Sequence, residues 1–269
     1  MKVLKIREVQ LLLLDLMKNL HQFLNNNQLP YYMIGGSALG SVRHQGFIPW
    51  DDDIDIGMFR EDYEKFLKIS NNFDSRYEIV NLRVVTNCDF CLTRIYLPNT
   101  KIDNPTIEKT CLDKRLYLDI FPLDNVPENE MERKKYEKRI KNCKRIISLT
   151  DVRDNGNPLP AMLIKNILSF CLNPFRNLIL KHTEKLMLKY REKETKLVCS
   201  LCSQYSFARQ VMDKSVYGKP VLSKFEDAYF YIPEKFGQYF TTLYGADYMD
   251  IPPESKRRKG YDIYLIEEN

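Results

Sequence analysis

Four aspartates crowd into the stretch "PWDDDIDIG", which begins at Pro49 and ends at Gly57. If this stretch forms a strand, Asp53 and Asp55 share one face and Ile54 the other, because successive side chains point to opposite faces. Two carboxylates at this spacing can hold a hard divalent cation through their oxygens. A bound cation would also explain why so many like charges are tolerated.

Two other interpretations of the acidic stretch were compared with a metal site. A calcium loop of EF-hand type needs Gly at position six and Glu at position twelve. Counted from Asp51, Gly57 is at position seven and Asp62 at position twelve, so this interpretation fails. A solvated acidic turn stays open, although the interleaved isoleucines favour a strand.

Gly35-Gly36-Ser37 precedes the acidic stretch. Glycines let a backbone approach a phosphate closely, and a helix beginning at Ser37 would direct its N–H groups toward that phosphate. Alone, this tripeptide is typical of a simple turn. Combined with the acidic strand, it predicts a phosphate on the loop and a metal ion on the carboxylates.

Four blocks of the sequence resemble the LicD family, the phosphocholine transferases of bacterial surface polysaccharides, to which fukutin-type proteins are related. The family has a nucleotidyltransferase fold. The blocks are "GGSALGSVRHQGFIPWDDDIDIGMFREDYEKFL", "CLTRIYLPNT", "YLDIFPLDNVP" and "FGQYFTTLYGADYMDIPPESKR". The likeness covers about residues 30–127 and 217–260 and is poor between them.

The resemblance implies that Asp53 and Asp55 are metal ligands and that Asp119 is the third carboxylate. It implies Mg²⁺, with Mn²⁺ as an alternative, and a CDP-choline or related CDP-alcohol donor. Phosphocholine would pass to a hydroxyl of a surface glycan or teichoic acid precursor, and CMP would leave. Asp119 lies between Leu118 and Ile120 on an apolar strand, where its charge needs a cation. The residues leave open whether that cation is the metal or a basic side chain.

Two alternative functions stay open. One is a nucleotidyltransferase that attaches a nucleotide to a small acceptor and releases pyrophosphate. The other is a non-catalytic relative that binds nucleotides or glycans.

Three basic residues are further candidates for phosphate binding. Arg43 and His44 follow the glycine loop, and Arg94 is on a predicted strand. Arg can clamp phosphate oxygens through its fork geometry, but Arg43 and His44 could equally face solvent. Trp50 is expected to pack beneath the site.

The fold predicted from these patterns is α+β, with a nucleotidyltransferase-type mixed β-sheet core flanked by helices and a mainly helical C-terminal half. We divide it into a catalytic core, residues 1–125, and a region, residues 126–269, that completes the site and the acceptor surface. Helices are expected over residues 3–24, 37–46, 60–70, 128–145 and 161–211, and strands over 31–36, 53–58, 77–97 and 115–126, the last stopped by Pro122.

Composition narrows the partners and the compartment. A net charge of +5 over 269 residues is too small to indicate a nucleic-acid-binding protein. No secretory signal is evident, and the seven scattered cysteines suit a reducing compartment, so we expect a cytoplasmic protein. The pairs Cys88/Cys91 and Cys199/Cys202 are expected to be free core thiols.

Contact with the inner face of the membrane is an alternative to a freely soluble state. Residues 161–181 are apolar with basic margins, and we expect a buried helical hairpin there, with an interfacial helix as the second interpretation. The basic run Lys256-Arg257-Arg258-Lys259 suits the same surface. The acceptor glycan would then be lipid-linked.

Overall fold

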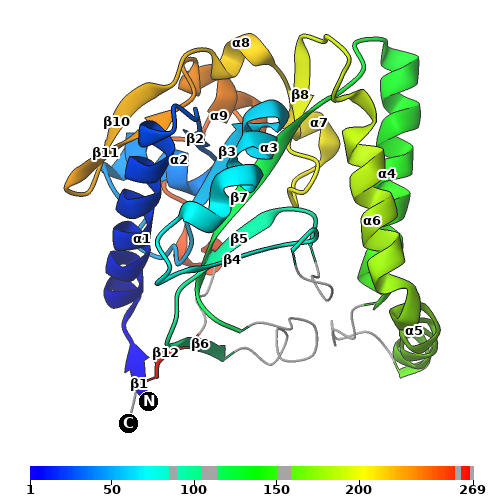
Figure 1. Cartoon of the computed structure of the whole chain (residues 1–269), viewed down its shortest axis with the longest axis horizontal. Helices are drawn as coiled ribbons and strands as arrows, with labels where there is room; N and C mark the ends of the chain where they lie inside the picture. The colour runs from blue at the N-terminus through cyan, green and yellow to red at the C-terminus, as the bar shows by residue number, and fades with distance from the viewer. Residues whose placement is uncertain (85–89, 104–113, 151–158, 258–261, 267–269) are drawn as a thin grey trace.

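A mixed β-sheet lies at the centre of the computed structural model, which describes residues 1–84, 90–103, 114–150, 159–257 and 262–266 (Figure 1). Its strand order is β2 (Tyr32–Met33), β3 (Asp55–Phe59), β7 (Tyr117–Asn125), β5 (Thr93–Tyr96) and β4 (Glu78–Asn81). Strands β3 and β7 are parallel and the other pairs are antiparallel. The expected α+β class is therefore confirmed, while the nucleotidyltransferase type stays a prediction.

Three helices of the N-terminal region pack on or beside this sheet, as the patterns predicted. They are α1 (Ile6–Asn26), α2 (Gly35–His44) and α3 (Arg60–Ile69), and α3 contacts both β3 and β7. Helix α3 buries Tyr63 and Phe66 on its sheet-facing side.

The first residues differ from the prediction. Lys2–Leu4 form strand β1 rather than the start of a helix, because β12 (Asp262–Leu265) supplies a partner for its backbone. Strand β12 also pairs with β6 (Thr100–Asp103), which completes a small second sheet beside the N-terminus (Figure 1).

Pro122 does not stop strand β7, which continues to Asn125. The Asp119 N–H points toward β3, where it donates to the Ile54 carbonyl (3.1 Å). Because backbone directions alternate, the missing N–H of Pro122 points away from β3. On that side β5 pairs with β7 only up to Ile120, and β8 (Leu197–Cys199) pairs only from Asp124. The proline therefore falls where no ladder hydrogen bond is lost.

The C-terminal half begins with a pair of long helices that stand beside the sheet (Figure 1). These are α4 (Glu130–Thr150) and α6 (Arg176–Met187), with α5 (Leu159–Leu172) at their lower end. The helical prediction is wrong beyond Tyr190, because residues 197–199 instead extend the sheet as β8. The remaining elements are β9 (Val211–Asp213), α7 (Phe207–Gln210), α8 (Lys214–Tyr217), β10 (Val221–Phe225), β11 (Ala228–Ile232) and α9 (Phe236–Tyr244).

Residues from both predicted regions contribute to the largest hydrophobic core. It joins Leu20 and Ile120 to Phe230, Phe240 and Ile263. A second cluster packs α4 and α6 against β8 through Tyr136, Met187 and Cys199. The two regions thus share a core, and the boundary at residue 125 stays a prediction.

The segment of residues 161–181 is not the buried hairpin that we expected. Several of its large apolar side chains are exposed, among them Phe170 at 83% and Leu178 at 66%. Within the described residues, no helix combines the length and apolar character needed to cross a bilayer.

Candidate functional site

Asp55 and Asp119 face each other across the two central strands. They are register partners in the parallel β3–β7 pair, so their Cα atoms are direct neighbours. Both side chains are partly buried. The structure thus brings together two of the three carboxylates that the resemblance implied as metal ligands.

Strand β3 is shorter than predicted and begins at Asp55 rather than at Asp53. The chain before it is still leaving a turn, in which the Asp51 N–H donates to the Ile48 carbonyl (2.9 Å). The buried Gln10 side chain holds this segment by donating to the Ile48 and Asp51 carbonyls. The predicted alternation nevertheless persists, since Asp53 and Asp55 are partly exposed while Ile54 is buried.

Asp51, Asp52 and Asp53 form a compact acidic group. One carboxylate oxygen from each lies within 4.8 Å of the others, and this is the one such group of three among the described residues. Oxygen donors at this spacing fit a hard divalent cation such as Mg²⁺ or Mn²⁺. The group shares only Asp53 with the set that the resemblance implied.

The amino end of α2 lies against these carboxylates. Gly35 has a φ of +57° at the turn from β2 into α2, a conformation that favours glycine. A Cβ atom added to Gly36 would lie 2.7 Å from Asp51 Oδ2, and one added to Gly35 would lie 3.7 Å from Asp55 Oδ2. The positive end of the helix therefore faces the acidic group and favours its charge.

Ser37 positions Asp55 within this arrangement. Its Oγ accepts a hydrogen bond from the Asp55 N–H (2.9 Å), and the side chain is buried. We predicted that this helix begins at Ser37, but in the structure it begins at Gly35. Ser37 thus ties the first turn of α2 to the start of β3.

Arg94 forms an ion pair with Asp119. The Arg94 Nε donates to Asp119 Oδ1 at 3.0 Å, and the two side chains are only 14% and 13% exposed. The guanidinium lies between the rings of Phe90 and Tyr117, with its carbon 4.1 Å from each centroid. Of the two partners left open for Asp119, the basic side chain is therefore present, and a metal role stays a prediction.

Arg43 and His44 lie in the last turn of α2, at the opposite end from Gly35. Arg43 Nη1 donates to the carbonyls of Tyr248 and Asp250, both at 3.0 Å, which anchors the C-terminal segment. Burial lowers the pKa of Arg43, and burial followed by the charge of Arg43 lowers the pKa of His44. A phosphate role for these two residues stays a prediction.

Trp50 packs as expected at the edge of the core, where its ring meets His44 edge-on. The guanidinium of Arg257 lies 4.4 Å from the Trp50 ring centroid. Arg257 is thereby engaged within the protein, and Arg258 and Lys259 lie outside the described residues.

Two tyrosines of α9 were missed by sequence reasoning. The Gly35 N–H donates to the buried Tyr239 Oη (3.0 Å), and the Tyr244 Oη lies near Gly35. Burial raises the pKa of both phenols, so they stay protonated. Only the resemblance of the "FGQYFTTLYG" block could have drawn attention to them.

Cys199 and Cys202 are free thiols, as predicted. Burial raises the pKa of both groups, that of Cys202 to about 12, so they are held protonated and unreactive. In the other pair Cys91 is also free, and Cys88 lies outside the described residues.

Comparison with known proteins defines the class of this site. Residues 28–147 match the family model described as LicD/FKTN/FKRP, nucleotidyltransferase domain. The chain is 25% identical over 280 residues to the lipopolysaccharide cholinephosphotransferase LicD of Haemophilus influenzae, covering 99% of this chain and 100% of that protein.

Two further relatives match over shorter regions. An uncharacterized protein of Rickettsia typhi, RT0683, is 35% identical over 123 residues, which are 44% of this chain and 36% of that protein. The human ribitol 5-phosphate transferase FKRP is 53% identical over 32 residues, which are 12% of this chain and 6% of that protein. The protein is accordingly a transferase. Its residues 28–147 form a LicD-family domain, as the sequence resemblance indicated.

Proposed function

We propose that this protein transfers phosphocholine, or a similar phospho-alcohol, from a CDP-linked donor to a hydroxyl of a cell-surface glycan or teichoic acid precursor. The full-length similarity to a cholinephosphotransferase supports choline as the first alcohol to test. The short match to a ribitol 5-phosphate transferase supports a wider range of phospho-alcohols.

The observation that carries the proposal is the register of Asp55 with Asp119 beside the amino end of α2. Asp53, Asp55 and Asp119 would hold Mg²⁺, or Mn²⁺ in its place. The bound ion would neutralise the charge of the pyrophosphate. Arg94 fixes the orientation of the Asp119 carboxylate through the 3.0 Å contact.

The first turn of α2 is suited to bind the donor phosphates. The Gly35 N–H is directed to Tyr239, and the first intrahelical bond is the one from the Ala38 N–H to the Ile34 carbonyl. The N–H groups of Gly36 and Ser37 precede that bond, and in the proposed complex they would donate to the donor phosphates.

In the proposed reaction the acceptor oxygen forms a bond to the phosphorus next to choline, and the bond from that phosphorus to the CMP oxygen breaks. CMP leaves with the electron pair, and Asp119 would orient the hydroxyl and accept its proton. In an in-line attack of this kind, the protein contributes mainly by positioning the reactants and not by forming a covalent bond to them.

The test is to incubate the purified protein with CDP-choline, Mg²⁺ and a glycan acceptor and to separate the nucleotide products by chromatography. CMP release that needs the acceptor supports the proposal, and Asp55→Asn should abolish it. The matched control is Asp227→Asn, which should keep full activity. Asp227 is an exposed carboxylate that pairs with Lys18 and is not one of the proposed metal ligands.

Other products would favour the alternatives. Pyrophosphate release from a nucleoside triphosphate, with the nucleotide attached to the acceptor, would identify a nucleotidyltransferase. Tight binding of CDP-choline without turnover would identify a non-catalytic relative.

A further inference from the structure

Helix α5 and the start of α6, at the lower end of the helical pair (Figure 1), carry a group of exposed large apolar side chains, here called the apolar tip. Helix α5 turns Ser169 inward, where its Oγ donates to the Thr150 carbonyl (3.0 Å). Four apolar side chains described on this helix are instead exposed to solvent. The exposed members of the tip are Ile164, Ile167, Leu168, Phe170, Phe175 and Leu178.

This arrangement is the reverse of that in an ordinary surface helix, which buries its apolar face and exposes its polar one. Exposed apolar residues that occur singly need no explanation, but a contiguous group usually marks a contact surface. The tip therefore needs an apolar partner.

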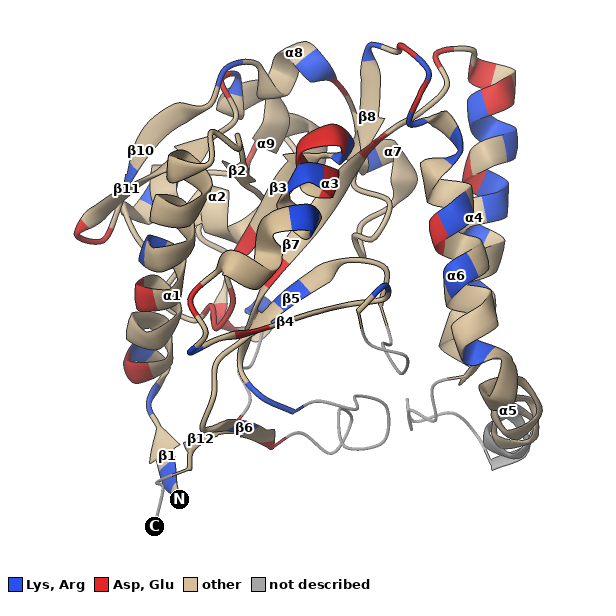
Figure 2. Cartoon of the chain, in the orientation of Figure 1, with Lys and Arg blue, Asp and Glu red and all other residues tan. Residues whose placement is uncertain are grey.

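Lys and Arg residues lie along α4 and α6, the helices that lead away from the tip (Figure 2). The described residues 138–150 and 159–183 contain eight Lys or Arg residues and no Asp or Glu. Arg145 lies in the last turns of α4 and Lys181 on α6, so both are near α5.

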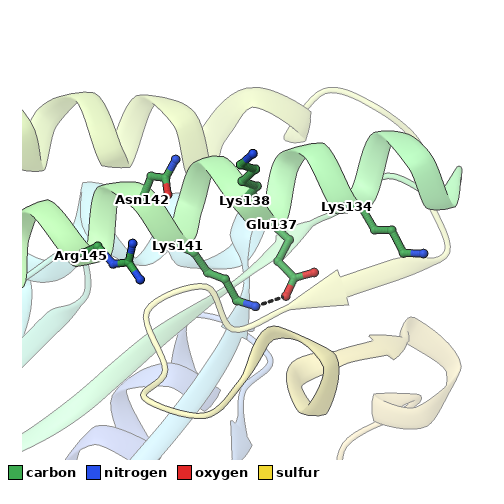
Figure 3. Close-up of a pocket in the computed structure, with 6 residues that line it drawn as sticks. All are labelled: Lys134, Glu137, Lys138, Lys141, Asn142 and Arg145. Carbon is green, nitrogen blue, oxygen red and sulfur yellow. Dashed lines mark ion pairs between the residues drawn. The ribbon is translucent and has the colours of Figure 1, made fainter.

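The positive charge continues along one side of α4 (Figure 3). Lys134, Lys138, Lys141 and Arg145 line an open groove of about 500 Å³ there. The acid among the lining residues, Glu137, is paired with Lys141. Lys134 is likewise paired with Glu130, so the net positive charge of the groove comes from Lys138 and Arg145.

We propose that the apolar tip docks the protein on an anionic lipid surface, with its apolar side chains entering the interface and the basic residues contacting headgroups. Apolar side chains flanked by Lys and Arg are the combination that binds such surfaces. A second copy of the chain would bring two positive tips together, which disfavours self-association. None of the tip residues belongs to the candidate catalytic site, so this inference is independent of the reaction.

The test is flotation of the purified protein with vesicles of phosphatidylcholine alone and of phosphatidylcholine mixed with phosphatidylglycerol. We expect binding to the anionic vesicles that weakens as salt is added. The double variant Phe170→Ser/Leu178→Ser should bind the anionic vesicles at least about tenfold more weakly, because it removes apolar surface that would be buried at the interface. The matched control is Leu222→Ser/Tyr229→Ser on the β10–β11 hairpin, whose side chains are similarly exposed and whose loss should change nothing.

A second pair of variants tests the charge. Arg145→Gln/Lys181→Gln should weaken binding to anionic vesicles by about fivefold for each charge removed. Lys68→Gln/Lys224→Gln, which removes two exposed charges elsewhere, should not.

Three results would overturn the proposal. The first is absence of vesicle binding by the unmodified protein at low salt, and the second is equal loss of binding in tip and control variants. The third is self-association that the tip variant abolishes without any vesicle binding, which would assign the tip to a second copy. Unchanged melting temperatures exclude unfolding as a cause, and flotation needs no activity, so failure of the proposed reaction would not affect this test.

Discussion

The Arg94–Asp119 pair offers a sharp physical test of how the site is held together. Replacing Arg94 with Met keeps the unbranched apolar stem but removes the guanidinium that pairs with the Asp119 carboxylate, which is 13% exposed. Loss of one member of a largely buried ion pair costs about 3–5 kcal/mol. The change also removes two cation–π contacts, to Phe90 and Tyr117. We therefore expect the free energy of unfolding to fall by about 4 kcal/mol.

A double-mutant cycle isolates the pair from these other contributions. Asp119→Asn alone should cost about 2 kcal/mol, because a charge-assisted hydrogen bond is weakened while the ring contacts to Arg94 persist. In the double variant no carboxylate is left unpaired, so the cost should be about 2 kcal/mol less than the sum of the single changes. Urea unfolding followed by circular dichroism, with a chelator present, measures all three without a contribution from bound metal.

The exposed pair Arg76–Asp74 is the control for this cycle, and its coupling should be small. A coupling between Arg94 and Asp119 no larger than that of the control would refute the reasoning. The free energy of unfolding of Arg94→Lys should lie between those of the unmodified protein and of Arg94→Met. Lysine keeps the charge but loses the planar group that lies between the rings.

Three further predictions concern the acidic group and α2. Ser37→Ala should lower the free energy of unfolding by about 1–2 kcal/mol in urea melts, because the Asp55 N–H loses its acceptor. Gly36→Ala should raise the Mg²⁺ concentration needed for CMP release, since the new Cβ, 2.7 Å from Asp51 Oδ2, forces that carboxylate to move; an unchanged requirement would contradict this. Asp53→Asn and Asp55→Asn should abolish transfer while the melting temperature in chelator holds or rises, because repulsion is relieved. Near-normal turnover of either variant at limiting Mg²⁺ would mean that the metal assignment is wrong.

The sequence predicted the local parts of the site because they depend on short spacings. Alternation placed Asp53 and Asp55 apart from Ile54, and the apolar neighbours of Asp119 indicated that its charge needs a partner. Helical spacing also predicted α1 and α3. Each of these inferences uses residues within a few positions of one another.

Contacts between distant segments could not be predicted in this way. Gly35 donates to a tyrosine 204 positions further along the chain, and no local pattern signals that bond. The continuation of β7 through Pro122 depends on where β5 and β8 stop pairing. Apolar content likewise does not tell a buried helix from an exposed one, which is why α5 was expected in the core.

The most direct measurement of the central claim follows two labels in CDP-choline, one in the choline methyl groups and one in the cytidine ring. With Mg²⁺ and a glycan acceptor present, the account predicts that the choline label appears in the glycan and the cytidine label in free CMP, in equal amounts. Both should disappear with Asp55→Asn and persist with Asp227→Asn. Cytidine label in the glycan, or CMP release without choline label in the acceptor, would contradict phosphocholine transfer.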